Sequence, residues 1–236
     1  MTGNISDDIV KTLTARAERL NAQELWNVLN GDNFILAGGA LCDNEPHDYD
    51  IYGAKKRLDL DKIQLRCEKF DVKVLASTTN ALTVEVGGQT VQFCRYWKNS
   101  LMALVQSFDF AHCQAGALFK SSEDNTYYVD EVYNTSEFIA AQACRDTCFT
   151  GSEYPLSSLM RAGKFYKQGK FANAHSYRMA VLEILRAVME RGMYDYKDIV
   201  DQMTAVSEGI EETKEAMMVS EMLKRDGNAP KRENEI

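Results

Sequence analysis

The sequence feature that most constrains the fold is an apolar run that ends in two glycines and precedes two aspartates one residue apart. The run NFILAGGA predicts a buried strand followed by a glycine turn, and HDYDIYG predicts a second strand. Because side chains alternate along a strand, Tyr49 and Ile51 are expected on one face and Asp48 and Asp50 on the other. Two carboxylates on one face repel each other, so this pattern predicts a compensating cation.

A divalent cation would relieve the repulsion between these two carboxylates. Carboxylates supplemented by water and phosphate oxygens suit Mg²⁺ or Mn²⁺. Two such ions about 3.5–4 Å apart can activate an attacking oxygen and steady a leaving pyrophosphate. Gly38 and Gly39 would let phosphate oxygens approach the backbone N–H groups without meeting a Cβ. The pattern favours a nucleoside triphosphate site, although a D-x-D pair also occurs in ordinary surface strands.

The remaining pattern predicts an α+β fold in two parts. Residues 1–134 alternate between helical and strand patterns, and a glycine pair at Gly87 and Gly88 gives the clearest hairpin signal. From residue 135 onward the pattern is almost entirely helical. We therefore expect a head with a small mixed β-sheet over 1–134 and a helical neck and C-terminal region over 135–236 with a frayed tail.

Composition excludes several classes of protein. No run of about 18 apolar residues is present, and the N-terminal residues lack the pattern of a signal peptide, so we expect a cytoplasmic protein without a membrane span. The net charge of −8 argues against a broad nucleic-acid-binding surface but leaves room for a local basic one. The six cysteines contain no C-x-x-C pair, which argues against a structural zinc site.

Three stretches, in order, resemble motifs of the nucleotidyltransferase superfamily with the DNA polymerase β-like fold. GGALCDNEPHDYDIYG is similar to its glycine and D-x-D motif, and FDFAHCQAGAL is similar to the RRDFTINALAY motif of class II CCA-adding enzymes and bacterial poly(A) polymerases. YPLSSLMRAGKFYKQGKF is similar to their neck helix, DPLRLLRAARFAARLGF. The resemblance covers about residues 30–171 and implies a polymerase β-like head with a helical neck.

The resemblance also implies roles for individual residues. Asp48 and Asp50 would be the metal ligands and catalytic carboxylates, and Gly38 and Gly39 would hold the triphosphate. In the second motif, Asp109 would lie near the ribose of the nucleotide, unless it only caps a helix. In the neck, Arg161 would face the phosphates, with Lys164 beside it, unless both are solvated helix charges.

The sequence also departs from the family pattern. Cys42 replaces an arginine of the glycine motif, and Gln92 stands where a third carboxylate is expected. Glu85 on the partner strand is an alternative third acid. No E-D-x-x-R element follows the neck stretch, so the resemblance implies no choice of base, and the long body and tail that hold tRNA in the family are missing.

Other candidate groups have simpler interpretations. His112 and Cys113 are neighbours, and on an α-helix such residues point about 100° apart, so no hydrogen-bonded dyad is expected. His47 is expected to be an exposed loop histidine. The lysines of KFYKQGK predict a basic face on one helix that contacts RNA or phosphate or is simply solvated. Methionines between residues 203 and 222 are expected to pack on neighbouring helices or on a second subunit, which would make an oligomer.

Two functional hypotheses follow from these observations. The first is a template-independent nucleotidyltransferase that moves a nucleoside monophosphate from an NTP to an acceptor hydroxyl, with Mg²⁺ or Mn²⁺ as cofactor. An RNA 3′ end is the favoured acceptor, and a protein or small-molecule hydroxyl stays open. The second is a degenerate nucleotidyltransferase head that acts as a nucleotide-binding or protein-interaction scaffold, an alternative favoured by Gln92 and Cys42.

Overall fold

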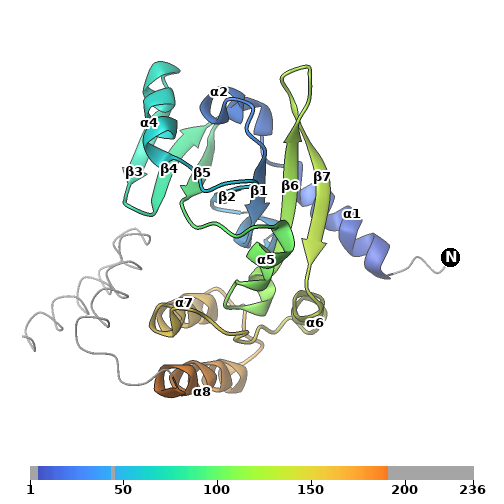
Figure 1. The fold of residues 1–236 in the computed structure, drawn as a ribbon. Coiled ribbons are helices and arrows are strands. Elements are labelled where there is room, and N and C mark those ends of the chain that lie inside the picture. The colour runs from blue at the N-terminus through green and yellow to red at the C-terminus, as the bar shows by residue number, and fades with distance from the viewer. Residues whose placement is uncertain (1–4, 44–45, 191–236) are drawn as a thin grey trace, which may run out of the picture.

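A mixed β-sheet organises the part of the chain that the structure, a computed structural model, describes, namely residues 5–43 and 46–190 (Figure 1). The seven strands of this part are β1 (Phe34–Ala37), β2 (Tyr49–Gly53), β3 (Lys73–Ser77), β4 (Ala81–Val86), β5 (Gln89–Cys94), β6 (Ala115–Ser121) and β7 (Tyr127–Asn134). The helices are α1 (Ile5–Ala17), α2 (Trp26–Leu29), α3 (Gly39–Cys42), α4 (Leu60–Lys69), α5 (Leu101–Gln106), α6 (Ser136–Cys144), α7 (Pro155–Lys167) and α8 (Ala174–Glu190). Two 3₁₀ turns complete the set, η1 (Ala22–Leu25) and η2 (Ala111–Cys113).

The strands are ordered β3-β4-β5-β2-β1-β6-β7, and all neighbours are antiparallel except the parallel pair β2 and β5. The sheet is therefore mixed, as the sequence predicted. The predicted β4–β5 hairpin is confirmed, because both of its turn glycines have positive φ, 57° at Gly87 and 76° at Gly88. This left-handed backbone is the one that glycine adopts at little steric cost.

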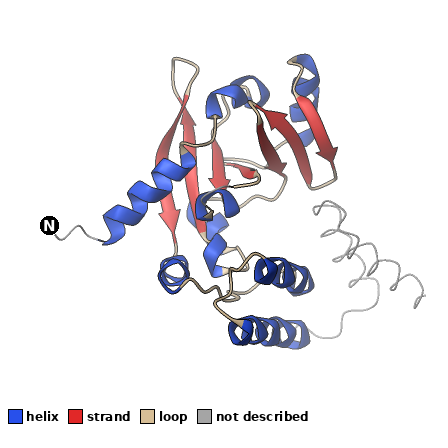
Figure 2. Cartoon of the chain, turned by 180° about the vertical axis from the view of Figure 1, so that it is seen from behind, coloured by secondary structure: helices blue, strands red, loops and turns tan. Residues whose placement is uncertain are grey.

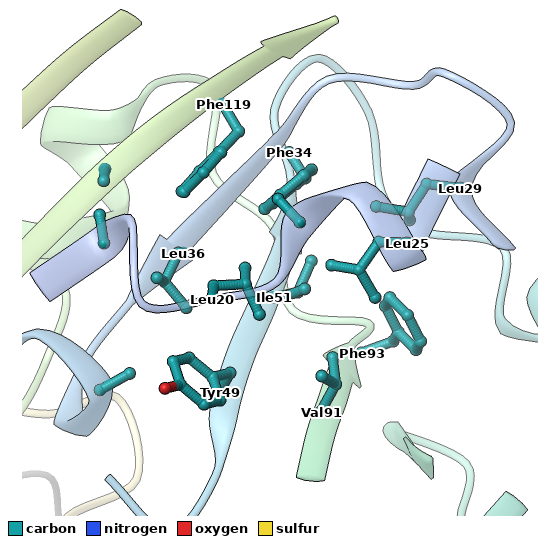
Figure 3. Close-up of a cluster of buried hydrophobic side chains, with 14 of the residues drawn as sticks. Leu20, Leu25, Leu29, Phe34, Leu36, Tyr49, Ile51, Val91, Phe93 and Phe119 are labelled. Carbon is teal, nitrogen blue, oxygen red and sulfur yellow. The ribbon is translucent and has the colours of Figure 1, made fainter. Parts of the chain in front are cut away.

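One face of the sheet forms the main core with the N-terminal helices. Figure 3 shows Leu25 and Leu29 from η1 and α2 lying against Phe34 and Phe93 of the strands. Tyr49 and Ile51 belong to this core, as the alternation along β2 predicted. All of these side chains are buried, so the face is closed to solvent.

The opposite face of the sheet is covered by α5. Leu101 and Val105 pack on Ile35, Ala37 and Tyr52 of the strands. Ser100 caps the helix by accepting a hydrogen bond from the N–H of Ala103, at 3.1 Å. A helix can lie this close because β6 carries Gly116, where an added Cβ would come within 2.7 Å of the Leu101 and Val105 side chains.

The helices α7 and α8 lie side by side beyond α5, as Figures 1 and 2 both show. They share a second core in which the Phe110 ring, from the segment before η2, packs edge-on against Phe165 of α7 at a centroid distance of 5.0 Å. The pattern of residues 108–119 predicts a helix that becomes a strand at its end. The strand is present as β6, but a bridge from Phe110 to Phe149 and the short η2 precede it in place of the helix.

Gly53, at the end of β2, tolerates no side chain. A Cβ added there would lie 1.8 Å from the carbonyl oxygen of Lys56, which is backbone and cannot rotate away. Gly53→Ala should lower the free energy of unfolding by about 2–3 kcal/mol, as overpacking does elsewhere. Gly163→Ala is the matched control: a Cβ there meets no atom within 4 Å, so the variant should gain about 0.5–1 kcal/mol through helix propensity. Urea unfolding of both variants measures the difference, and equal effects would contradict this account.

Candidate functional site

Asp50 lies in β2 on the face of the sheet that carries α5, and Asp48 lies just before the strand, which begins at Tyr49. Asp50 pairs in register with Ala37 on β1 and with Gln92 on β5, so these side chains lie on one face. The α5 helix covers Ala37, whereas Asp50 is half-buried and Asp48 is exposed. The paired carboxylates therefore lie where the helix cover of the sheet ends.

The glycine turn lies next to this carboxylate pair. Gly38 has φ of 83°, and a Cβ added there would lie 3.7 Å from Oδ2 of Asp50. The Gly38 N–H donates a hydrogen bond to the carbonyl of Ala115 at 3.1 Å, which anchors the turn to β6. At Gly39, the first residue of α3, an added Cβ would meet no atom within 4 Å. Space for an approaching group therefore exists beside the turn.

The surroundings of Asp50 disfavour its ionised form. Burial, followed by repulsion from Asp48, raises the pKa of Asp50 to about 7, while Arg161 and Lys164 act in the opposite direction. Both of these cations come from α7, which brings the helix within electrostatic reach of β2. An added cation would stabilise the ionised form of both carboxylates.

Asp109 and Arg161, expected separately at the ribose and at the phosphates, form an ion pair with each other. Arg161 Nη1 lies 2.7 Å from Asp109 Oδ1, and Ser158 donates a hydrogen bond from its hydroxyl to Asp109 Oδ2 at 2.7 Å. Asp109 is buried, while the Arg161 side chain is 38% exposed and lies over the Phe165 ring. The guanidinium therefore bridges the buried Asp109 and the region of Asp50.

Two further ion pairs hold the helical part against the sheet part. Lys98, between β5 and α5, lies 2.9 Å from Glu153 just before α7, and Lys170, just after α7, pairs with Asp43 after α3. Together with the Asp109–Arg161 pair they fix both ends and the middle of α7. Because α3 begins in the glycine turn and ends next to Asp43, the Lys170–Asp43 pair connects that turn to the end of α7.

The expected third carboxylate is a glutamine engaged in other contacts. Gln92 lies next to Asp50 in the sheet, and its Nε2 donates to Oγ1 of Thr83 at 3.3 Å. Asp50 is aligned with Thr83 of β4 across β5, and Glu85 lies two residues beyond Thr83, which puts it about 12 Å from Asp50 by ordinary strand spacing. Glu85 also forms an ion pair with Lys73 at 3.1 Å. Glu85 therefore cannot supply the third acid in this arrangement.

The donor set of the site fits a magnesium ion that shares its ligands with a phosphate. Mg²⁺ is often held by one or two carboxylates while its other ligands are water and substrate phosphates. Asp48 and Asp50 meet that need, since burial and then the charge of Asp48 raise the pKa of Asp50 and a bound cation would offset both effects. In residues 5–43 and 46–190, no group of three or more His, Cys, Asp or Glu side chains is placed to hold a metal ion.

His112 and Cys113 do form a hydrogen-bonded contact, contrary to the expectation. Their segment is the 3₁₀ turn η2 rather than an α-helix, and this geometry brings the Cys113 sulfur to 3.3 Å from Nε2 of His112. The pair is nevertheless unsuited to nucleophilic chemistry. Burial raises the pKa of Cys113 to about 12, and Nδ1 of His112 is occupied by the Thr147 hydroxyl at 2.8 Å.

His112 predicts a pH dependence of stability. Burial, with Lys170 and Arg161 nearby, lowers its pKa from 6.5 to about 3, so the unfolded chain takes up a proton first as the pH falls. The stabilisation is complete above pH 6.5 and should decrease by about 1.4 kcal/mol per pH unit between that pH and 3. The difference in the free energy of unfolding between the wild type and His112→Gln, from urea unfolding between pH 5 and 7.5, should show this slope below pH 6.5, because the opposite contribution of Asp50 is common to both proteins. The exposed His175→Gln should retain the slope, and the account fails if both variants behave alike.

Sequence reasoning missed the residue that supports the glycine turn from behind. Arg16 of α1 donates from Nη1 to the carbonyl oxygens of Leu41 and Cys42, at 2.7 and 3.2 Å, at the end of α3. A cation here complements the exposed carbonyls of a helix end. No local pattern marks Arg16, since the contact spans 25 residues of sequence.

The basic face predicted for KFYKQGK is only partly present. Lys164 and Lys167 belong to α7, but the helix ends at Lys167, so Lys170 lies beyond it and pairs with Asp43 instead.

A cavity of about 250 Å³ lies away from the candidate site, between α1 and α6, with Leu13 and Phe138 in its wall. The predicted methionine face at 203–222 lies outside the described residues. None of the helices in the described ranges has the length and apolar character needed to cross a membrane.

Solved structures resemble this chain in fold. A CCA-adding enzyme in complex with ATP matches at 12% identity and a TM-score of 0.50, covering 91% of this chain and 53% of that chain. A CCA-adding enzyme in complex with CTP matches at 13% identity and a TM-score of 0.50, over 91% and 53% of the two chains. The Thermotoga maritima CCA-adding enzyme complexed with tRNA matches at 13% identity and a TM-score of 0.49, over 92% and 54%.

The chain thus spans about half the length of these proteins. Neither a family model nor a curated protein matches the sequence. The similarity at TM-score 0.50 covers 91% of this chain, and it agrees with the fold that the sequence predicted. The chain therefore has the α+β fold of the nucleotidyltransferase head found in CCA-adding enzymes.

Proposed function

We propose that this chain is a template-independent nucleotidyltransferase that transfers a nucleoside monophosphate from an NTP to an acceptor hydroxyl, most favourably an RNA 3′ end. The observation that carries the proposal is the half-buried Asp50 with Asp48 beside it, next to the Gly38 turn and within reach of Arg161 and Lys164. Carboxylates for a cation and cations for phosphates lie around one point of a nucleotidyltransferase fold. A triphosphate combines the chemistry that both sets require.

Each residue has a role in this proposal. Asp48 and Asp50 would hold Mg²⁺, which would supply charge neutralisation for the triphosphate and its leaving pyrophosphate. The backbone at Gly38 and Gly39 binds phosphate oxygens. On α7, Lys164 attracts the phosphates as an exposed charge.

Two further residues orient the nucleotide in the proposal. Arg161 is held in place by its ion pair with Asp109, and its remaining N–H groups can donate to the triphosphate. Asp109, fixed by Ser158 on one oxygen and by Arg161 on the other, acts through Arg161 by holding its guanidinium toward the site. Holding the reacting groups in place accounts for a large share of the acceleration in phosphoryl-transfer enzymes.

A second function, a nucleotide-binding or protein-interaction scaffold, is favoured by one specific observation. Gln92 stands beside Asp50 and is bonded to Thr83, so no third carboxylate is at hand to take the proton of the attacking hydroxyl. A protein of this kind would bind nucleotide through Asp48, Asp50 and the glycine turn without transferring it.

Label transfer distinguishes the two functions. The full chain is incubated with each of four α-³²P-labelled NTPs, with Mg²⁺ or Mn²⁺, and with separate pools of RNA, protein and small-molecule acceptors. Label that appears in one acceptor pool, requires the metal and disappears in the Asp48→Asn, Asp50→Asn double variant supports the transferase. Metal-dependent nucleotide binding without any transfer supports the scaffold and contradicts the transferase.

A further inference from the structure

The turn at Gly38 and Gly39 is anchored at its start, but it leads into a helix that is too short to hold itself. The Gly38 N–H donates to the carbonyl of Ala115 on β6 at 3.1 Å. The helix that follows, α3, has only four residues, and an isolated helix of one turn is unstable because it makes too few hydrogen bonds. The end of the turn therefore depends on contacts with other parts of the chain.

Two cations from distant parts of the sequence supply such contacts at the end of α3. Arg16 of α1 donates from Nη1 to the carbonyl oxygens of Leu41 and Cys42, at 2.7 and 3.2 Å. Lys170, just after α7, pairs with the carboxylate of Asp43. A cation at the end of a helix satisfies carbonyl groups that have no partner within the helix.

Both cations act on the same short segment. Burial raises the pKa of the Cys42 thiol, while the charges of Lys170 and Arg16 act in the opposite direction, so both charges lie near this side chain. The Cys42 sulfur lies 3.1 Å from the carbonyl oxygen of Gly38, which links the end of α3 back to the turn. Arg16 and Lys170 are both half-buried.

The position of this segment decides how the turn lies beside the carboxylates. A Cβ added at Gly38 would lie 3.7 Å from Oδ2 of Asp50, so the turn and this carboxylate are neighbours. At Gly39 an added Cβ would meet no atom within 4 Å, so the backbone between the two anchored ends is open. Hydrogen bonds weaken when donor and acceptor move out of line, so a shifted turn would hold phosphate oxygens poorly.

We propose that Arg16 and Lys170 are positioning residues, which hold the glycine turn in the geometry that binds a triphosphate beside Asp50. Neither residue needs to touch the nucleotide, since Arg16 acts through the carbonyls of α3 and Lys170 acts through Asp43. The proposal rests on the proposed function in one respect, because it takes the turn as the group that binds phosphate oxygens. It applies equally to transfer and to nucleotide binding without transfer.

A purely structural role is the competing account, and the chain offers a matched control for it. Arg66 of α4 donates from Nη1 to the carbonyl of Val28 in α2, another helix of four residues, at 3.3 Å. Arg66 is half-buried, as Arg16 is. Val28 belongs to the main core, on the face of the sheet opposite to Asp50. Arg66→Met therefore removes the same kind of contact away from the glycine turn.

Calorimetric titration of the full chain with inorganic tripolyphosphate in the presence of Mg²⁺ tests the proposal. This probe carries three linked phosphates without a base or a ribose, so it reports on the phosphate part of the site. Arg16→Met should weaken its binding about tenfold, the equivalent of about 1.4 kcal/mol. Arg66→Met should change binding by less than about twofold, although both variants should lower the midpoint of urea unfolding. Equal weakening by the two variants, or no binding by the wild type, would overturn the proposal.

A second variant keeps the proposal testable if the first fails to fold. Lys170→Met removes the contact to Asp43 and should weaken tripolyphosphate binding at least about threefold. Lys120→Met is its matched control, because Lys120 pairs with Asp130 at 2.9 Å and lies five residues along β6 from Ala115, about 17 Å away. The control should bind within about twofold of the wild type. Equal losses would show that only the net charge matters, and they would overturn the proposal.

Kinetics separate failure of this proposal from failure of the proposed function. In the label-transfer assay, Arg16→Met should raise the KM for the NTP about tenfold and lower kcat less than about threefold, since the turn holds the phosphates in the ground state and the transition state alike. Tripolyphosphate binding that depends on Arg16, without transfer by the wild type, would support the positioning role and contradict the transferase. Transfer by the wild type with a KM that neither Arg16→Met nor Lys170→Met changes would support the transferase and overturn the positioning role.

Discussion

Asp50→Asn should abolish nucleotide transfer and at the same time raise the free energy of unfolding. We expect the rate to fall at least a thousandfold, about 4 kcal/mol of transition-state stabilisation, because the variant loses a ligand charge at the centre of the site. Asp50 is half-buried and repelled by Asp48, so the neutral amide removes an unfavourable charge from the folded state. The gain should be about 1–2 kcal/mol at pH 8, a value already reduced for partial exposure to solvent.

Glu85→Gln is the matched control for Asp50→Asn. It removes a carboxylate from the same sheet, but Glu85 is exposed and pairs with Lys73, so activity and stability should both stay close to those of the wild type. Urea unfolding without metal and label transfer with metal measure the two effects on the same samples. An Asp50→Asn variant that is less stable than the wild type would show that the carboxylate serves folding rather than a bound cation.

Arg161→Met should destabilise the chain more than Asp109→Asn does. Removing the guanidinium leaves Asp109, which is 5% exposed, with an uncompensated charge, and such losses cost about 3–5 kcal/mol for a fully buried pair. Because the Arg161 side chain is 38% exposed, we expect a smaller loss of about 2–3 kcal/mol. Asp109→Asn leaves Arg161 free to reach water and should cost about 1 kcal/mol.

The double variant tests whether the two residues act as a pair. Arg161→Met combined with Asp109→Asn should be more stable than the sum of the single losses implies, with a coupling energy of about 1–2 kcal/mol from urea unfolding. Nucleotide transfer should stay low in all three variants, since both residues are proposed to orient the nucleotide. Strictly additive losses would mean that the 2.7 Å contact carries no net interaction energy, and the Asp109–Arg161 pair would then not hold α7 in place.

Much of the fold could be predicted from local pattern. The alternation along β2 placed Ile51 in the core and Asp50 on the other face, and the Gly87-Gly88 pair marked the β4–β5 hairpin. These predictions were confirmed because a strand and a two-residue turn are set by neighbours in sequence.

The boundary at 134/135, the roles of the site residues, the magnesium ion and the cytoplasmic location stay predictions from the sequence. Two relations that only the structure shows bear on those roles, namely the proximity of Gly38 to Asp50 and the hydrogen bond from Gln92 to Thr83.

The sequence by itself determined the α+β class, the position of Asp50 on the face of β2 opposite Ile51 and the glycine turn before it. Only the tertiary structure decided that Arg161 neutralises Asp109, that Lys170 holds Asp43 and that Glu85 is too far away to serve the site. The physical reason is range: periodicity and turn chemistry act over a few residues, whereas ion pairs across α7 depend on how separate elements pack. Charge partners separated by 50 to 130 residues leave no signal in any local window.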